Sequence, residues 1–257
     1  MIPITVACVL IAVLTNVKFS IIINILIAVL SSIGLKGNAF YIATMLFSGC
    51  TGAFMFAKAS MRKNLAISSM AFCGLNAVIY FILGVAEGVE IKNALYQGLY
   101  GILSGLITSI VVTGTLPLWE TIFDIVTPYR LTELSNSNQP LLKKLIVEAP
   151  GTYHHSLMVG NLAEAACEAI GGDYLLARVG AYYHDIGKLS NPEMFAENQY
   201  VENHHDNLSP ETSAEIIISH VKKGLQLADL YKLPKVIKHI IASHHGTTKA
   251  AYFYFRA

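Results

Sequence analysis

The sequence predicts an all-α protein in which a polytopic helical membrane domain is followed by a cytoplasmic all-helical domain. Three observations predict it: an uneven distribution of charge, long uncharged runs in the first half, and helical patterning throughout the second half. Hydrophobic residues make up 54% of the 257 residues and charged residues only 14%, with a mean hydropathy of +0.51. Soluble domains carry about 25% charged residues, so this composition indicates that part of the chain lies in a membrane.

The charge distribution places the membrane part in the first half. Residues 1–119 hold eight charged side chains, whereas the remaining 138 residues hold 27. The uncharged runs of the first half cover 1–17, 19–35, 37–57, 64–86 and 93–119. A bilayer core requires roughly 17–25 apolar residues of helix, and five successive runs exceed what a cleaved signal peptide explains. We therefore predict about five spans in a transmembrane domain of residues 1–126.

Loop charges predict the orientation, because cytoplasmic loops carry an excess of Lys and Arg. With five spans, the mainly basic loops share one side: Lys18, Lys58, Arg62, Lys63 and the segment that begins near Arg130. The opposite side carries both signs: Lys36, Glu87, Glu90 and Lys92. Residues 127–257 are therefore predicted to face the cytoplasm, in a multi-pass protein of the inner (plasma) membrane. The formal net charge of +1 indicates no polynucleotide partner.

The second half is predicted to be helical from its proline and glycine punctuation and its apolar periodicity. Residues 127–149 form a linker, marked by the polar stretch 135–139, and Pro140 opens a short helix that Pro150 ends. The domain that follows, 150–257, is predicted to hold helices at about 152–170, 174–184, 210–220 and 234–243. Gly187 breaks the second of these, and Ser209 is the N-cap of the third.

All nine histidines follow residue 150, and two polar doublets, His184-Asp185 and His244-His245, interrupt the ends of apolar helices. Such doublets are costly to bury without partners. Neighbouring residues on a helix point about 100° apart, so two adjacent ligands suit a binuclear centre better than a single ion. Asp185 can bridge two metals through its two oxygens. Imidazole and carboxylate ligands suit iron, manganese or zinc, and the four scattered cysteines form no thiolate motif.

The other polar candidates are less specific. His220 alone supports either a ligand or a structural role. His154, His204 and His239 are interpreted as surface or core histidines, and the loop pair His204-His205 as a solvated cluster. Lys188 follows the first doublet by about one turn, where it either contacts a phosphate oxygen as a point charge or ends a helix in solvent.

Four segments carry a resemblance to a known family: "HHSLMVGNLAEAA", "VGAYYHDIGK", "SPETSAEIIISHV" and "IIASHHGTT". They resemble the HD phosphohydrolase superfamily, and more closely the seven-transmembrane receptor HD family of the PgpH type, which are bacterial cyclic di-AMP phosphodiesterases. The resemblance runs from the last membrane spans to the C-terminus. It implies a site for two divalent metal ions held by six residues: His155, His184, Asp185, His220, His244 and His245.

The resemblance also implies that the sequence is a fragment truncated at both ends. Full-length relatives carry an extracellular sensing domain and two further spans before the region seen here, and they complete the ligand set with an aspartate in a later "MLAD"-like helix. No such motif follows the last helix. We therefore expect an incomplete HD domain that binds metal weakly or at one site, and a fragment with little or no activity.

The function that the resemblance implies is metal-dependent hydrolysis of cyclic di-AMP to linear pApA in bacterial second-messenger signalling. Two cations can hold a phosphodiester, activate water and stabilise the leaving oxygen, with iron or manganese favoured and zinc possible. Asp185 and Lys188 are the candidate catalytic residues. Two alternatives stay open: hydrolysis of another nucleotide or of cyclic di-GMP, whose hydrolases carry a Gly-Tyr-Pro tripeptide absent here, and a membrane receptor that senses its ligand without turnover.

Overall fold

The structure is a computed structural model that describes residues 4–34, 36–57, 62–199, 203–249, 251 and 252. Within these ranges every regular element is an α-helix or a short 3₁₀ turn, which confirms the predicted all-α class. The chain divides into two compact units, Met1–Tyr129 and Arg130–Ala257. Each unit is described separately below.

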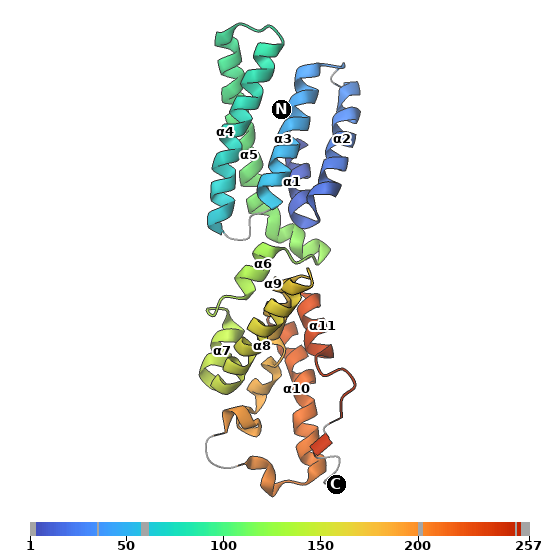
Figure 1. Cartoon of the computed structure of the whole chain (residues 1–257), viewed down its shortest axis with the longest axis vertical. Helices are drawn as coiled ribbons and strands as arrows, with labels where there is room; N and C mark the ends of the chain where they lie inside the picture. The colour runs from blue at the N-terminus through green and yellow to red at the C-terminus, as the bar shows by residue number, and fades with distance from the viewer. Residues whose placement is uncertain (1–3, 35, 58–61, 200–202, 250, 253–257) are drawn as a thin grey trace. The chain divides into compact units, whose positions relative to one another are not determined.

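The described residues of the first unit form α1 (Ile4–Leu14), α2 (Val17–Gly34), α3 (Ala39–Ala57), α4 (Arg62–Ala86) and α5 (Ile91–Phe123). Helices α2 to α5 stand side by side (Figure 1), and each is long and apolar enough to cross a membrane. The described part of the first predicted span is shorter, because α1 has only 11 residues. The Asn16 side chain accepts a hydrogen bond from the Phe19 amide at 2.8 Å, which starts α2 within the predicted run 1–17.

Helices α4 and α5 pack along their lengths because α5 presents glycines to α4. A Cβ added at Gly101 would lie 2.5 Å from the carbonyl oxygen of Asn76, and one added at Gly105 would lie 2.9 Å from the Cα of Cys73. Small residues let backbones approach in this way in membrane helices, where dispersion replaces the hydrophobic effect as the source of attraction. The α4–α5 pair is therefore specified by glycine positions rather than by large apolar side chains.

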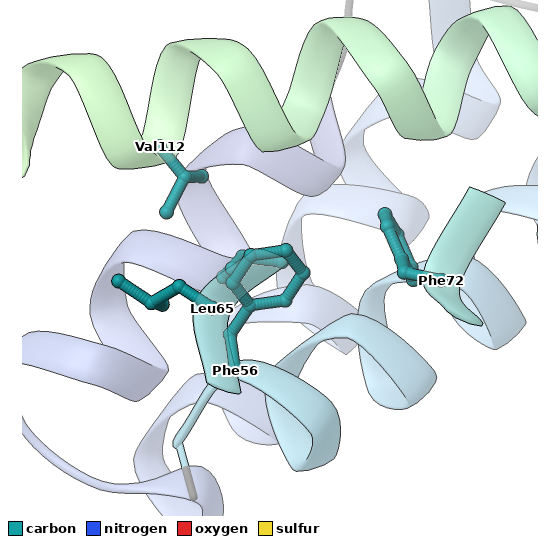
Figure 2. Packing of buried hydrophobic residues seen from close by; sticks show 5 residues of the cluster. Phe56, Leu65, Phe72 and Val112 are labelled. Atoms are coloured by element: carbon teal, nitrogen blue, oxygen red, sulfur yellow. The ribbon is translucent and has the colours of Figure 1, made fainter. Parts of the chain in front are cut away.

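A cluster of apolar side chains joins α1 and α3 to α4 and α5. Figure 2 shows Phe56 of α3, Leu65 and Phe72 of α4, and Val112 of α5 around the same space, and Val9 of α1 completes the cluster. The two phenylalanine rings meet edge to face, with centroids 5.8 Å apart and planes at 87°, the arrangement that aromatic quadrupoles prefer. Four helices from distant parts of the sequence thus share one core.

The second unit contains helices and short 3₁₀ turns, and α6 begins just before the division. Its elements are α6 (Pro128–Leu134), α7 (Pro140–Glu148), α8 (Pro150–Ala169), α9 (Tyr174–Tyr183), η1 (Ile186–Ser190), η2 (Pro192–Met194), η3 (Ala196–Asn198), η4 (His204–Asn207), α10 (Pro210–Leu230) and α11 (Lys235–Ser243). Proline opens α6, α7, α8 and α10, as expected for a residue whose missing N–H costs nothing in the first turn. Pro150 thus begins α8, besides ending α7.

Two expectations for this unit were wrong in detail. We expected His220 in the last turn of its helix, but α10 continues to Leu230. The reason is that Gly224 and Ala228 extend the buried stripe at four-residue spacing. We also expected the pair at 204–205 to be solvated, but His205 is buried in η4, and its Nε2 lies 2.7 Å from the carbonyl oxygen of Met194.

Buried anchors hold the segment that carries the first polar doublet. Tyr183 and Ile186 flank this doublet and are 1% and 0% exposed. The Tyr183 hydroxyl donates a hydrogen bond of 2.9 Å to the carbonyl oxygen of Leu134. Burying a side chain such as Ile186 stabilises a fold by about 1.5–3 kcal/mol relative to exposure. The doublet is therefore fixed from both sides by packing.

Candidate metal centre

Asp185 lies at the centre of a cluster of ionisable side chains just beyond the end of α9, and its own side chain is only 4% exposed. Its Oδ2 atom lies 3.2 Å from Nε2 of His184 and 2.8 Å from Nζ of Lys188. Its Oδ1 atom lies 3.3 Å from Nε2 of His220 and 3.5 Å from Nε2 of His244. One buried carboxylate therefore gathers groups from α9, η1, α10 and the end of α11.

The three imidazoles around Asp185 are held in the same way. In each ring Nδ1 faces the backbone carbonyl three residues earlier: His184 with Ala181 at 2.7 Å, His244 with Ile241 at 2.8 Å, and His220 with Ile217. A neutral imidazole carries one N–H. When that proton sits on Nδ1 and bonds to the carbonyl, Nε2 presents its lone pair. Histidines that bind metals are oriented by this kind of second hydrogen bond.

The local geometry fits a cation between these groups. The Nε2 atoms of His220 and His244 lie 3.3 Å apart, and with Nδ1 as the protonated atom two lone pairs face each other. The Oδ1 atom of Asp185 is buried and has no hydrogen bond among the described residues. Buried polar atoms without partners are costly, and nitrogen and oxygen lone pairs that converge are the donor set of a transition-metal site.

The structure brings all six residues that the resemblance implies as metal ligands into two groups. One group contains Asp185, His220, His244 and His245, and the other contains His155, His184 and Asp185; in each, the candidate ligand atoms lie within 4.8 Å of one another. Asp185 belongs to both groups. The three histidines interpreted as surface or core residues, His154, His204 and His239, are exposed and lie outside these groups.

The surroundings favour the metal-binding forms of Asp185 and His245, whereas at His184 they favour the protonated ring. Burial by itself would raise the pKa of Asp185, but the surrounding imidazoles of His184, His220 and His244 hold that pKa far below the ordinary range. Burial and the neighbouring imidazoles lower the pKa of His245. Burial would also lower the pKa of His184, yet the bond and charge of Asp185 raise it overall. An anionic carboxylate and neutral imidazoles are the forms that coordinate metal.

Lys188 is not a solvated helix end, because its side chain is only 13% exposed. Its ammonium group also lies 2.7 Å from Oε1 of Glu197 and 5.0 Å from the centre of the Phe195 ring. Burial would lower the pKa of Lys188, but the charges and hydrogen bonds of Asp185 and Glu197 raise it. Sequence reasoning did not single out Glu197, since an isolated carboxylate nine residues after Lys188 has no distinguishing spacing.

Comparison with known proteins assigns both units. The model of the 7TM receptor with intracellular HD hydrolase matches residues 1–127, and the HD domain model matches residues 152–254. The chain belongs to the 7TM receptor HD family. Family membership confirms the resemblance found in the sequence, identifies a membrane protein, and implies that the HD domain binds a divalent metal.

Relatives of this 7TM receptor HD protein include two curated proteins named cyclic-di-AMP phosphodiesterase PgpH. The one from Bacillus subtilis (strain 168) is 40% identical over 269 residues, which cover 100% of this chain and 37% of the relative. The one from Listeria monocytogenes (strain 10403S) is 40% identical over 261 residues, which cover 99% of this chain and 36% of the relative. The chain therefore spans little more than a third of each.

A solved structure is also similar to part of this 7TM receptor HD protein. The crystal structure of the L. monocytogenes phosphodiesterase PgpH HD domain in complex with cyclic-di-AMP is 53% identical in sequence. The match covers 48% of this chain and 57% of that chain, with a TM-score of 0.46.

Proposed function

We propose that the chain belongs to a metal-dependent phosphodiesterase that hydrolyses cyclic di-AMP to linear pApA as part of bacterial second-messenger signalling. The observation that carries the proposal is the position of Asp185, shared by two groups of candidate metal ligands. A carboxylate shared in this way can bridge two ions, the arrangement used for in-line displacement at phosphodiesters. The names of the 40% identical relatives support cyclic di-AMP as the substrate.

In this proposal the two ligand groups have separate roles. His155, His184 and Asp185 hold one divalent ion, and Asp185 with His220, His244 and His245 holds the other. Iron or manganese suits the nitrogen and oxygen donors, and zinc is possible. When bound, the ions supply a water nucleophile at neutral pH and stabilise charge on the attacked phosphodiester. The protein fixes the ligands: Ala181, Ile217 and Ile241 orient three of the rings through their carbonyls.

Lys188 is proposed to act on the phosphate. A lysine ammonium group has three donors, and Asp185 and Glu197 accept two of them. The third donor can contact a phosphate oxygen, where the positive charge would stabilise the charge that develops during hydrolysis. The two carboxylates hold the ammonium group in one place, so little reorganisation accompanies binding of the substrate.

We expect the full chain, purified in detergent and loaded with Mn²⁺, to convert cyclic di-AMP to pApA only at the low level expected from its sequence, and we expect a chelator to abolish that conversion. The chelator acts because neither water activation nor charge stabilisation is available without the ions. The measurement is chromatography of the products from a panel of cyclic di-AMP, cyclic di-GMP and linear dinucleotides. Preference for cyclic di-GMP would favour the alternative hydrolase, and binding without turnover of any substrate would favour the sensing receptor.

We further propose that α2 to α5 cross the inner (plasma) membrane, surrounded by its lipids, with the HD domain on the cytoplasmic side. The basis is the loop charge, with the basic residues at 58–63 on the side of the HD domain and the mixed loop at 87–92 on the other. A reporter fused after Ala257 is expected to behave as cytoplasmic, and one inserted between Glu87 and Lys92 as external. Cytoplasmic behaviour of the Glu87 insertion would contradict this orientation.

A further inference from the structure

The N-terminal turn of α8 is held by residues far away in the sequence. Its N-cap, Ala149, contributes no side-chain hydrogen bond, although the first turn of any helix leaves amide groups that require partners. Asn198 supplies one, because its Oδ1 accepts a hydrogen bond of 3.0 Å from the amide of Thr152. A residue of η3, 46 positions further along the chain, therefore acts as the cap of α8.

The same contact continues through the Thr152 hydroxyl, which is fully buried. That hydroxyl accepts a bond of 2.9 Å from Nδ2 of Asn198 and donates one of 3.0 Å to Oε1 of Glu197. A Cβ added at Gly151 would lie 1.8 Å from the carbonyl oxygen of Glu197. The backbones of α8 and η3 are thus in direct contact, and only glycine fits between them.

Glu197 extends this contact to the centre of the site. The Oε1 atom that accepts from Thr152 also lies 2.7 Å from Nζ of Lys188, and that Nζ lies 2.8 Å from Oδ2 of Asp185. Burial would raise the pKa of Glu197, but the hydrogen bond and charge of Lys188, together with the hydrogen bond from Thr152, lower it overall, so the carboxylate stays ionised. A continuous chain of polar contacts therefore runs from the first turn of α8 to Asp185.

These polar contacts connect the turn of α8 that precedes His155 with Asp185, the residue shared by the two ligand groups. His155 follows Thr152 by three residues, which is nearly one turn of α8, and its ring centre lies 5.6 Å from that of His184. His155 is exposed, so packing of its own side chain does not fix it. Its position relative to Asp185 depends on where the first turn of α8 is held.

We propose that Glu197 and Asn198 form a clamp that positions His155 and Lys188 relative to Asp185. Both are positioning residues: Asn198 holds the helix that carries His155, and Glu197 joins that helix to the lysine beside the bridging carboxylate. The inference rests on the proposed function for its link to hydrolysis. Its direct consequence, however, is metal affinity. Outer partners of metal ligands typically contribute roughly 10- to 100-fold in affinity or activity.

The test is a titration of the metal-free full chain in detergent with Mn²⁺, following free Mn²⁺ by electron paramagnetic resonance. Asn198→Ala and Glu197→Ala are each expected to weaken the binding of one Mn²⁺ by roughly 10- to 100-fold. Glu197→Gln is expected to restore most of the affinity, since its amide oxygen still accepts from Thr152 and Lys188. Glu193→Ala is the matched control, because Glu193 is an exposed carboxylate of the adjacent η2 and is expected to bind Mn²⁺ as the unchanged chain does.

Thr152→Val provides the same test if an alanine variant does not fold. It keeps the capping amide and the shape of the side chain, and removes only the hydroxyl that joins Asn198 to Glu197. A loss of affinity for one Mn²⁺ with unchanged helical circular dichroism supports the clamp. Unchanged Mn²⁺ affinity in Thr152→Val and in every folded alanine variant overturns it.

Failure of the clamp and failure of the proposed function give different results. If the unchanged chain hydrolyses no cyclic di-AMP but the variants lose Mn²⁺ affinity as expected, the clamp stands and the proposed function fails. If the unchanged chain is active and the variants bind Mn²⁺ normally, the clamp fails and the proposed function stands.

Discussion

Replacing Asp185 with alanine is expected to abolish hydrolysis of cyclic di-AMP and to remove bound metal from both halves of the site. Asp185 is the residue common to the two ligand groups, so one substitution takes a ligand from each ion. It also leaves the ammonium group of Lys188, which lay 2.8 Å from Oδ2 of Asp185, as a positive charge beside the remaining imidazoles. This ammonium group repels a metal ion that approaches the imidazoles. The loss of metal affinity should therefore exceed the loss caused by removing one ligand alone.

Thermal unfolding with and without Mn²⁺ measures this loss independently of activity. A ligand present at a hundredfold excess over its Kd stabilises the folded state by about 2.7 kcal/mol. The unchanged chain is expected to gain melting temperature with Mn²⁺, and Asp185→Ala is expected to gain none. His239→Ala is the control, because His239 is exposed and lies outside both ligand groups. Normal metal content and turnover in Asp185→Ala would show that Asp185 does not bridge two ions.

Local chemistry in the sequence was sufficient to predict most helices of the second unit, but not α6, which lies in the predicted linker, nor the full length of α10. Proline openings placed α7 and α10, and a helix expected at about 152–170 is observed as Pro150–Ala169. The doublets at 184–185 and 244–245 were conspicuous because they place polar groups where apolar side chains are expected. The helix starts and the polar doublets each depend on a few neighbouring residues, so both can be recognised from the sequence alone.

The assembly of the site depends on contacts between distant residues, which spacing does not encode. His220 lies in the middle of α10 with nothing local to distinguish it, and only the approach of η1 to α10 brings its Nε2 within 3.3 Å of Asp185. The same holds for Glu197 and Asn198, whose roles follow from the return of η3 to the start of α8. Family resemblance identified the six candidate ligands in the sequence. The residues that position them, such as Glu197 and Asn198, could be identified only from the structure.

The break between α1 and α2 illustrates a different limit. The run 1–17 is uncharged and was interpreted as one span, because hydropathy averages over a window. A single side chain, Asn16, accepts the amide hydrogen of Phe19 and begins a new helix there. Local hydrogen bonding of this kind competes with helix continuation, and an average over apolar residues does not detect it.

The second large effect is expected at Gly187, which lies two residues after Asp185 in η1. A Cβ at this position would lie 1.8 Å from the carbonyl oxygen of His220 and 2.5 Å from the amide nitrogen of Gly224. Both are backbone atoms of α10, so no side-chain rotation relieves the overlap. Gly187→Ala must therefore push η1 away from α10, and inserting atoms into a close-packed contact typically costs about 1–3 kcal/mol and occasionally more.

Separation of η1 from α10 also changes the site, because Asp185 is on one element and His220 on the other. Metal–ligand distances tolerate changes of only about 0.2 Å, so Gly187→Ala is expected to lower both the melting temperature and the affinity for Mn²⁺. Gly224→Ala is the graded comparison: its Cβ would lie 3.1 Å from Cγ2 of Ile241, a side chain, and 3.3 Å from the amide nitrogen of Gly187. Neighbours there need to move by only a few tenths of an ångström, and alanine favours the helix, so the loss should be smaller in both measurements. Equal effects of the two substitutions, or none from Gly187→Ala, would mean that the contact of η1 with α10 does not set the position of Asp185.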